Sequence, residues 1–447
     1  MMLNTLENYF EKAPQNKKIQ LDLIEDLVNN SFNKEKLISK SKNKRQLTNK
    51  MENPKYTMVE TFVGCGGAHL GFKNNGFRSL LVNDIDENMI KTLIQNKMVN
   101  ESQCLTCSIE EITPDIIREK IKEDVDVLFG GIVCKGFSMA GVRNPFDKRN
   151  YLYKSQLKLV EQIRPKVSVI ENVIGLKNMM LYKKNKTTQS IFKKFNKLND
   201  VNKKLNGIKS AKRKQGEPYD DLNKQILDNK KNMKVMLDHI SKFKYSIHED
   251  ICNIYERLGY KVYSKVLVAG NYNGYTTRKR LIIVAVRNDI EKVYEFPEEE
   301  KSYNLIDALC KIDYENANST ENDVDNRPMN HNEKTVRRFK FIPEGKNIAD
   351  IIDTLPDDLK ISKFYSRGNT QRLDRNKQCP TLVPGHSNFP IHPEEHRSIT
   401  VREAATITGF PLDYKFYGSH TSRCMQIGNA VPVYLADAIA KSIKKIL

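Results

Sequence analysis

The chain has 447 residues, a formal net charge of +19 at pH 7 and no tryptophan. This length allows two or three domains, and the excess of lysine suggests a polyanionic partner such as nucleic acid, although charge alone leaves a solvated lysine-rich surface as the alternative. Eight cysteines without a pairing pattern are typical of a reducing compartment. Because there is neither a secretory signal pattern nor an apolar run of membrane-spanning length, we expect a soluble cytoplasmic protein without a membrane partner.

The N-terminal stretch, residues 1–55, differs from the rest of the chain. It is polar and rich in lysine, with weak helical periodicity around Leu21, Ile24 and Leu27. We interpret it as a basic N-terminal helical arm that is partly without fixed structure.

From Met58 onward, short apolar stretches alternate with helical patterns. Each stretch has the length and the β-branched composition of a buried strand. Alternation of this kind predicts an α/β fold with a doubly wound, mostly parallel sheet. The stretches are residues 58–63, 79–84, 125–129, 167–170, 262–268 and 281–286.

Two regions interrupt this pattern. Residues 178–247 are crowded with Lys and Asn and predict an inserted, lysine-rich helical hairpin, whose charge either contacts phosphates or is simply solvated. Residues 300–390 show no sustained periodicity, so we expect a small irregular domain there. The remaining residues, 56–300 and 390–447, are expected to form the main domain, which closes with helices at 401–409 and after Pro432.

A glycine cluster, Gly64-Cys65-Gly66-Gly67, directly follows the first predicted strand. Glycines at a strand–helix turn let the backbone approach a ligand closely, although the spacing differs from the dinucleotide fingerprint. Asp84 ends the second strand, where an acidic residue can accept hydrogen bonds from ribose hydroxyls. Together these features indicate a nucleotide-like cofactor other than nicotinamide.

Cys134 follows Gly130-Gly131 at the end of another predicted strand. The carboxyl ends of such strands are where open α/β sheets build their sites, so this cysteine is either a nucleophile or a packed core residue. Glu171 ends the next strand and could deliver a proton at the same edge. Arg278 and Arg280 alternate along the chain and could hold an anionic or carbonyl-bearing group.

Cys104 and Cys107 have the spacing of half a zinc site. No second pair of Cys or His lies at a suitable distance along the chain. We therefore expect no metal.

Taken in order, these segments resemble the DNA cytosine-5 methyltransferase family over nearly all of residues 58–447. The resemblance implies a Rossmann-like methyltransferase fold that uses S-adenosyl-L-methionine, with residues 300–390 as a target-recognition domain. The segments are Glu60–Gly67 with Gly71-Phe72, Asp84, Cys134, Glu171-Asn172-Val173, Arg278-Lys279-Arg280, Arg402-Glu403-Ala404, Gly409-Phe410-Pro411 and Gln426–Pro432.

This resemblance implies methyl transfer from S-adenosylmethionine to carbon 5 of a cytosine flipped out of a specific double-stranded DNA sequence. Such an enzyme would be the modification half of a restriction–modification system, act as a monomer and have a cognate restriction endonuclease. The alternatives are a tRNA cytosine-5 methyltransferase of the same family and a catalytically silent DNA-binding relative.

The resemblance also implies a role for individual residues. Cys134 would attack ring carbon 6, Glu171 would protonate ring nitrogen 3, and Arg280, with Arg278, would hold the base oxygen or support Glu171. The cofactor-binding residues would be Phe62, Gly64, Gly66, Gly67, Asp84, Ile85 and Asn429. The residues contacting DNA would be Lys135, Ser138, Asn172, Arg367, Gln371 and Arg372.

Four positions depart from the family pattern. Val133 and Lys135 flank Cys134 where the family usually has Pro and Gln, and the added lysine would favour the thiolate. Ser108 stands where many relatives carry an Asp that recognises adenine, and Thr276 stands where a Gln is usual. None of these changes removes the predicted nucleophile or acid, so we expect activity to be retained.

Overall fold

The computed structural model describes residues 54–132, 144–312, 314, 323–361, 368–385 and 388–447. The predicted N-terminal arm lies almost wholly outside these ranges. Cys134, Lys135, Ser138 and Arg367 also lie outside them, as does Val133. Within the described ranges, no helix is both long enough and apolar enough to span a membrane.

A seven-stranded sheet forms the centre of the fold, with the strand order β3-β2-β1-β4-β5-β9-β8. The first five strands run parallel, and β9 is antiparallel to both of its neighbours. The predicted doubly wound, mostly parallel sheet is therefore confirmed; β3 was not predicted because it has only three residues. The strands are β1 (Tyr56–Thr61), β2 (Phe77–Asp84), β3 (Cys104–Thr106), β4 (Val127–Gly131), β5 (Val167–Asn172), β8 (Tyr260–Val268) and β9 (Lys279–Arg287).

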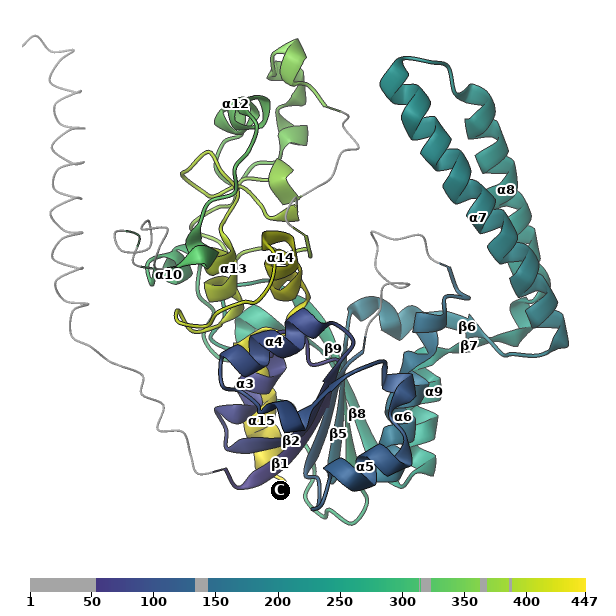
Figure 1. Cartoon of the computed structure of the whole chain (residues 1–447), viewed down its shortest axis with the longest axis vertical. Coiled ribbons are helices and arrows are strands. Elements are labelled where there is room, and N and C mark those ends of the chain that lie inside the picture. Colours follow the sequence, from purple (N-terminus) through teal and green to yellow (C-terminus); the bar gives the residue numbers. More distant parts are fainter. Residues whose placement is uncertain (1–53, 133–143, 313, 315–322, 362–367, 386–387) are drawn as a thin grey trace, which may run out of the picture. The chain divides into compact units, whose positions relative to one another are not determined.

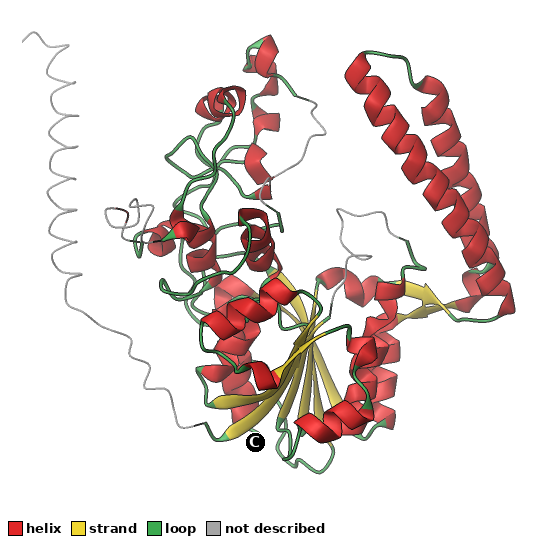
Figure 2. Cartoon of the chain, viewed as in Figure 1, coloured by secondary structure: helices red, strands yellow, loops and turns green. Residues whose placement is uncertain are grey.

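Helices cover both faces of the sheet (Figure 2). Successive strand residues point to opposite faces, so Phe129 packs on one face and Leu128 on the other. Because both faces are covered, the central parallel strands β1, β4 and β5 are buried along almost their whole length. One face carries α3 (Gly67–Lys73) and α15 (Val433–Lys444), and the other carries α5 (Pro114–Lys120), α6 (Leu152–Ile163) and α9 (Ile247–Arg257).

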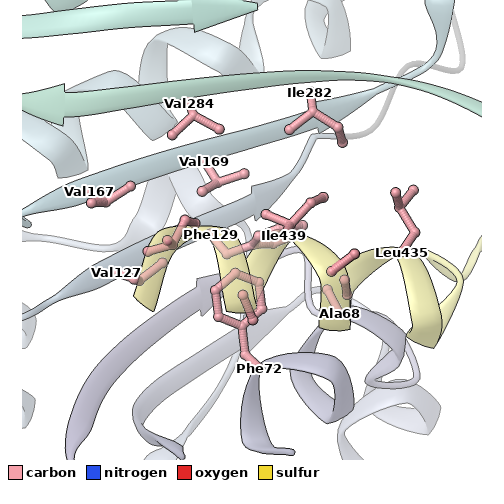
Figure 3. Packing of buried hydrophobic residues seen from close by; sticks show 14 of the residues in the cluster. Ala68, Phe72, Val127, Phe129, Val167, Val169, Ile282, Val284, Leu435 and Ile439 are labelled. Carbon is pink, nitrogen blue, oxygen red and sulfur yellow. The ribbon is translucent and has the colours of Figure 1, made fainter. Parts of the chain in front are cut away.

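Helices α3 and α15 pack directly on each other beside the sheet. Figure 3 shows Phe72 of α3 and Ile439 of α15 meeting Phe129 of the sheet in one apolar cluster. Gly71 permits this approach, because a Cβ at that position would lie 2.6 Å from the Cβ of Ala436. The Gly71-Phe72 motif thus has a packing role.

Residues 178–247 contain two consecutive helices that pack on each other, α7 (Lys186–Gln215) and α8 (Asp220–His239) (Figure 1). Their base is closed by the short antiparallel strands β6 (Met180–Tyr182) and β7 (Lys244–Ser246). Tyr182, Phe195, Met233 and Ile240 of this insertion are buried and form one apolar cluster with Phe146.

The region of residues 300–390 contains little regular structure. It has the helices α10 (Leu305–Leu309) and α12 (Glu333–Phe341), and isolated bridges in place of strands among its described residues. A small core around Phe339, Ile348 and Ile391 holds it together.

The chain then returns to the main domain. Besides α15, this part contains α13 (Val401–Thr408) and α14 (His420–Asn429), and α4 (Glu87–Gln95) follows β2 in the main domain. Helix α14 was not predicted because half of its buried residues, Gln426 and Gly428, are not apolar.

Candidate active site at the carboxyl edge of the sheet

Five strands meet at one edge of the sheet. The parallel strands β1, β2, β4 and β5 end there, and β9 begins there because Leu281 pairs with Asn172. The order of strands reverses between β1 and β4, which is the position where open α/β sheets bind their ligands.

The loop after β1 has an unusual backbone. Phe62 has a φ of 53°, which is uncommon for a residue with a side chain, and Gly66 has a φ of 86°. Asp84 holds this loop: one carboxylate oxygen accepts a hydrogen bond from the Gly64 N–H at 2.9 Å, and the other accepts one from the Asp86 N–H at 2.9 Å. Burial raises the pKa of Asp84, while these two donors act in the opposite direction.

Residues from the far end of the sequence support the same loop. A Cβ at Gly67 would lie 2.2 Å from the carbonyl oxygen of Val431, so only glycine fits there. The Tyr414 hydroxyl donates to the carbonyl of Cys65 at 2.7 Å, and the Cys65 thiol donates to the carbonyl of Gln426 at 3.4 Å. Sequence analysis missed Tyr414, since no motif or spacing singles it out.

The surroundings of the loop fit a nucleoside cofactor. No heavy atom of the described chain lies within 4 Å of where a Cβ would project from Gly64, so a ligand can approach the backbone there. The Ile85 side chain is 73% exposed beside Asp84, although it is large and apolar. Asn429 is exposed as well, and each Asp84 oxygen keeps a lone pair for a ribose hydroxyl.

A buried ion pair joins β5 to β9. The Arg280 Nε lies 2.6 Å from Oε1 of Glu171, and each side chain is 10% exposed. Gly131, at the end of β4, is close to the other carboxylate oxygen: a Cβ there would lie 3.8 Å from Glu171 Oε2. The acid is therefore fixed in orientation beside Gly131 at the end of β4, which comes three residues before Cys134 in the sequence.

Asn172 holds the same exit. Its side-chain amide donates to the carbonyl of Ile132 at 3.3 Å, and its oxygen accepts from the Val173 N–H at 2.8 Å. Ile132 is the last described residue before Cys134. These two hydrogen bonds of Asn172 therefore hold the main chain in position just after β4 and β5.

Arg278 and Arg280 have different environments, although they are two residues apart. The Arg278 guanidinium is buried and donates to the carbonyls of Leu382 and Gly428, at 3.3 and 2.9 Å, and of Asn429 at 3.3 Å. Burial lowers the pKa of Arg278, and the nearby charge of Arg280 adds to this effect. Arg278 thereby ties the start of β9 to the segment that supports the glycine loop.

Two of the departures from the family pattern make local contacts. The Thr276 hydroxyl donates to the carbonyl of Pro380 at 3.4 Å and accepts from the Arg278 N–H at 3.3 Å. Ser108 caps a short turn by accepting from the Glu110 N–H at 3.3 Å.

The prediction that Arg372 contacts DNA is wrong. Its side chain is buried, and its guanidinium donates to four main-chain carbonyls at 2.6–2.7 Å. The fifth N–H of the guanidinium faces His396 Nδ1 at 3.1 Å, so no donor is left to face a base edge. The carbonyls belong to Phe339, Ile342, His392 and Glu395.

Gln371 is next to Arg372 but differs from it. Its main chain bridges to Asn347, and its side chain is half-buried. It remains a candidate for contacting DNA.

No group of three or more His, Cys, Asp or Glu side chains in the described ranges is arranged to hold a metal ion. Cys104 and Cys107 are both half-buried. The Asn83 amide donates to the carbonyl of Cys107 at 2.8 Å.

Comparison with known proteins gives the chain its family. The model of the C-5 cytosine-specific DNA methylase family matches residues 56–203 and 226–445. A Type II methyltransferase of Escherichia coli, M.Eco47II, is 30% identical over 410 residues, which cover 88% of this chain and 80% of that protein. M.Sau96I of Staphylococcus aureus, also a Type II methyltransferase, is 27% identical over 400 residues, covering 88% and 76% of the two chains.

Solved structures share the fold at lower identity. A protein encoded within an Escherichia coli prophage has a TM-score of 0.58 at 20% identity, covering 88% of this chain and 99% of its own. A DNMT2 mutant of Spodoptera frugiperda has a TM-score of 0.53 at 14% identity, covering 87% and 100%. With the family model matching most of its length, the chain belongs to the C-5 cytosine-specific DNA methylase family.

Proposed function

We propose that this protein transfers a methyl group from S-adenosylmethionine to carbon 5 of a cytosine within a specific double-stranded DNA sequence, as a DNA (cytosine-5-)-methyltransferase. The observation that carries the proposal is the Glu171–Arg280 pair at the exit of β4, at the edge of the sheet that also carries the glycine loop and Asp84. A fixed acid and a nucleoside site at one edge provide the parts for this reaction.

S-adenosylmethionine is the methyl donor of the family, and when bound it supplies an electrophilic methyl group on a sulfonium. Phe62, Gly64, Gly66 and Gly67 would hold it, together with Asp84, Ile85 and Asn429. Asp84 would accept hydrogen bonds from the ribose hydroxyls while still tying the loop to α4.

Cytosine is a poor nucleophile at carbon 5, and the chain's own residues would correct this. The Cys134 thiolate forms a bond to ring carbon 6, while Glu171 gives a proton to ring nitrogen 3. The ring then behaves as an enamine, so that carbon 5 becomes nucleophilic. After carbon 5 has taken the methyl group, loss of its proton and return of the nitrogen 3 proton to the Glu171 carboxylate would restore the ring and break the bond to the cysteine sulfur.

Arg280 would keep the Glu171 carboxyl aimed at the base. Since the target atom is stacked inside the duplex, the base must leave the stack, which costs a few kcal/mol to be recovered from protein contacts. The net charge of +19 supports phosphate binding and predicts an affinity that falls steeply with salt. We extend the proposal to a modification enzyme that acts as a monomer beside a separate restriction endonuclease.

A covalent trap tests the mechanism. Duplex DNA that carries 5-fluorocytosine at the target position cannot lose its carbon 5 substituent, so we expect a stable protein–DNA adduct. Bisulfite sequencing of DNA from a host that expresses the protein identifies that target beforehand. Cys134→Ser should form no adduct and transfer no labelled methyl group.

Competition between duplex DNA and tRNA in the labelled assay identifies the substrate class. Transfer to tRNA alone would contradict the proposal, and so would wild-type protein that forms no adduct on its identified site.

A further inference from the structure

The charge of the inserted hairpin is concentrated on one of its two helices. Helix α7 contains nine lysines, one arginine and a single acidic residue, Asp200. Helix α8 contains four lysines and four aspartates, so its charges balance. The two helices are neighbours in the same Lys- and Asn-rich insertion. A general bias towards lysine therefore does not explain why one helix has a large net charge and the other has none.

Four of the lysines in α7 lie along one line. They are separated by seven, four and seven residues, and such spacings return to the same side of a helix. Phe195 and Asn202 are buried on the opposite side of the helix, whereas these four lysines are exposed. At about 1.5 Å per residue the line is about 27 Å long, which matches about eight base pairs of duplex DNA. This lysine stripe consists of Lys186, Lys193, Lys197 and Lys204.

No carboxylate of the described residues lies within 4.0 Å of a stripe lysine. Among its described side chains, α7 makes ion pairs from Lys203 to Asp200 and from Lys212 to Glu217, and both lysines lie outside the stripe. Lysines four residues apart, such as Lys193 and Lys197, repel each other on a helix. The unpaired positive charges of the stripe therefore lower the stability of the isolated helix. Phosphates bound along the stripe would offset this loss of stability.

The base of α7 is fixed to residues 144–146, where the described part of the chain resumes after the segment that contains Cys134. The Asn144 amide donates to the Asn196 side-chain oxygen at 3.0 Å, and the Phe146 ring lies 4.9 Å from that of Phe192 and 5.2 Å from that of Phe195. These contacts alternate in sequence with the first lysines of the stripe. The family model omits residues 204–225, so the far end of the hairpin lies outside the shared domain.

We propose that the lysine stripe of α7 binds the phosphate backbone of duplex DNA outside the segment that contains the flipped base. This inference rests on the proposed function, because it adds a second contact surface to the same DNA. It assigns no base recognition to the hairpin, since lysine contacts to phosphate carry no sequence information.

A matched pair of variants tests the proposal. In the stripe variant, Lys186, Lys193, Lys197 and Lys204 are changed to Gln; in the control variant, the four α8 lysines are changed to Gln. Both variants lose the same charge from exposed positions of the same hairpin. The α8 lysines are Lys224, Lys230, Lys231 and Lys234.

The measurement is the affinity for non-specific duplexes of about 40 and about 12 base pairs over a range of salt concentrations, where one helical turn is about 10 base pairs. For the longer duplex, we expect the stripe variant to bind at least about tenfold more weakly and its salt slope to fall by about 3, because each released phosphate contact accounts for about 0.9. The short duplex should show little difference between variants. A third variant with the four stripe lysines changed to Arg should keep the wild-type slope.

Equal weakening by the stripe and control variants would overturn the proposal, because net charge alone would then explain the affinity. Unchanged binding by the stripe variant would overturn it too. Failure of the proposed function is distinguishable, since non-specific binding is measured without methyl transfer. The 5-fluorocytosine adduct of the stripe variant on a short specific duplex reports the chemistry separately.

Discussion

Two regions of this protein use arginine in opposite ways. At the carboxyl edge of the sheet, Arg280 pairs with Glu171 and leaves the acid facing the site. In the irregular region, Arg372 is surrounded by main-chain carbonyls and faces no ligand. The comparison teaches that residue type predicts a role only where a regular element fixes the direction of the side chain. The described residues of the irregular region form isolated bridges in place of strands, so its buried carbonyls need side-chain donors. An arginine can donate to these carbonyls as well as to a DNA base.

Among the variants that test this comparison, the largest effect is expected from Glu171→Gln. The amide keeps the shape of the side chain and an oxygen for Arg280 but cannot supply the proton, so we expect methyl transfer to slow by about 10²–10⁴-fold. Single-turnover transfer of labelled methyl measures this, with binding to the duplex as the control. A variant that transfers methyl at the wild-type rate would remove Glu171 from the mechanism.

Arg372→Met should destabilise the protein and leave its specificity alone. Four buried carbonyls would lose a charged donor, so we expect the free energy of unfolding to fall by on the order of 3 kcal/mol or more. Urea unfolding measures the loss, and bisulfite sequencing shows whether the recognised sequence changes.

Arg375→Met is the matched control for this prediction. Its guanidinium pairs with Glu344 and Glu394 at the surface, and such pairs contribute about 1 kcal/mol or less. If Arg372→Met changed the target sequence without lowering the stability, Arg372 would contact DNA, and the contrast drawn between the two regions would be wrong.

Arg280→Lys and Arg278→Lys should separate two effects at the sheet edge. Lysine keeps the charge but lacks the planar fork, so Arg280→Lys should misorient Glu171 and slow transfer by about 10–100-fold. Arg278→Lys should instead lower the thermal midpoint of unfolding, because it releases the carbonyls of Leu382 and Gly428. Equal losses of rate at equal stability would show that both arginines act on the acid.

The smallest effect is expected from Gln371→Ala. If its amide contacts a base edge, discrimination at one position of the target should fall by about 1–3 kcal/mol, with stability unchanged. Deep bisulfite sequencing of near-cognate sites measures this. An unchanged ranking of those sites would remove Gln371 from recognition and leave the main-chain bridge to Asn347 as its role.

Much of the sheet could be predicted because its central strands are short, mainly apolar stretches, and β2, β4 and β5 end at or beside an acid or a glycine. Asp84 and Glu171 stand at strand ends, so their shared edge followed from the parallel order. The different roles of Arg278 and Arg280 could not be predicted. Arg278 is buried because it donates to carbonyls that are about 100 or more residues away in sequence. Tyr414 was missed for the same reason: its partner, the carbonyl of Cys65, lies 349 residues earlier in the sequence.

The support of the glycine loop by Tyr414, Gln426 and Val431 has a consequence for synthesis of the protein. Ribosomes complete β1 and its loop early, but the groups that brace this loop arrive more than 300 residues later. A nascent chain that lacks α15 also leaves the apolar side of α3 uncovered. Cofactor affinity should therefore arise only once translation has passed this segment, which keeps unfinished chains from competing for the methyl donor.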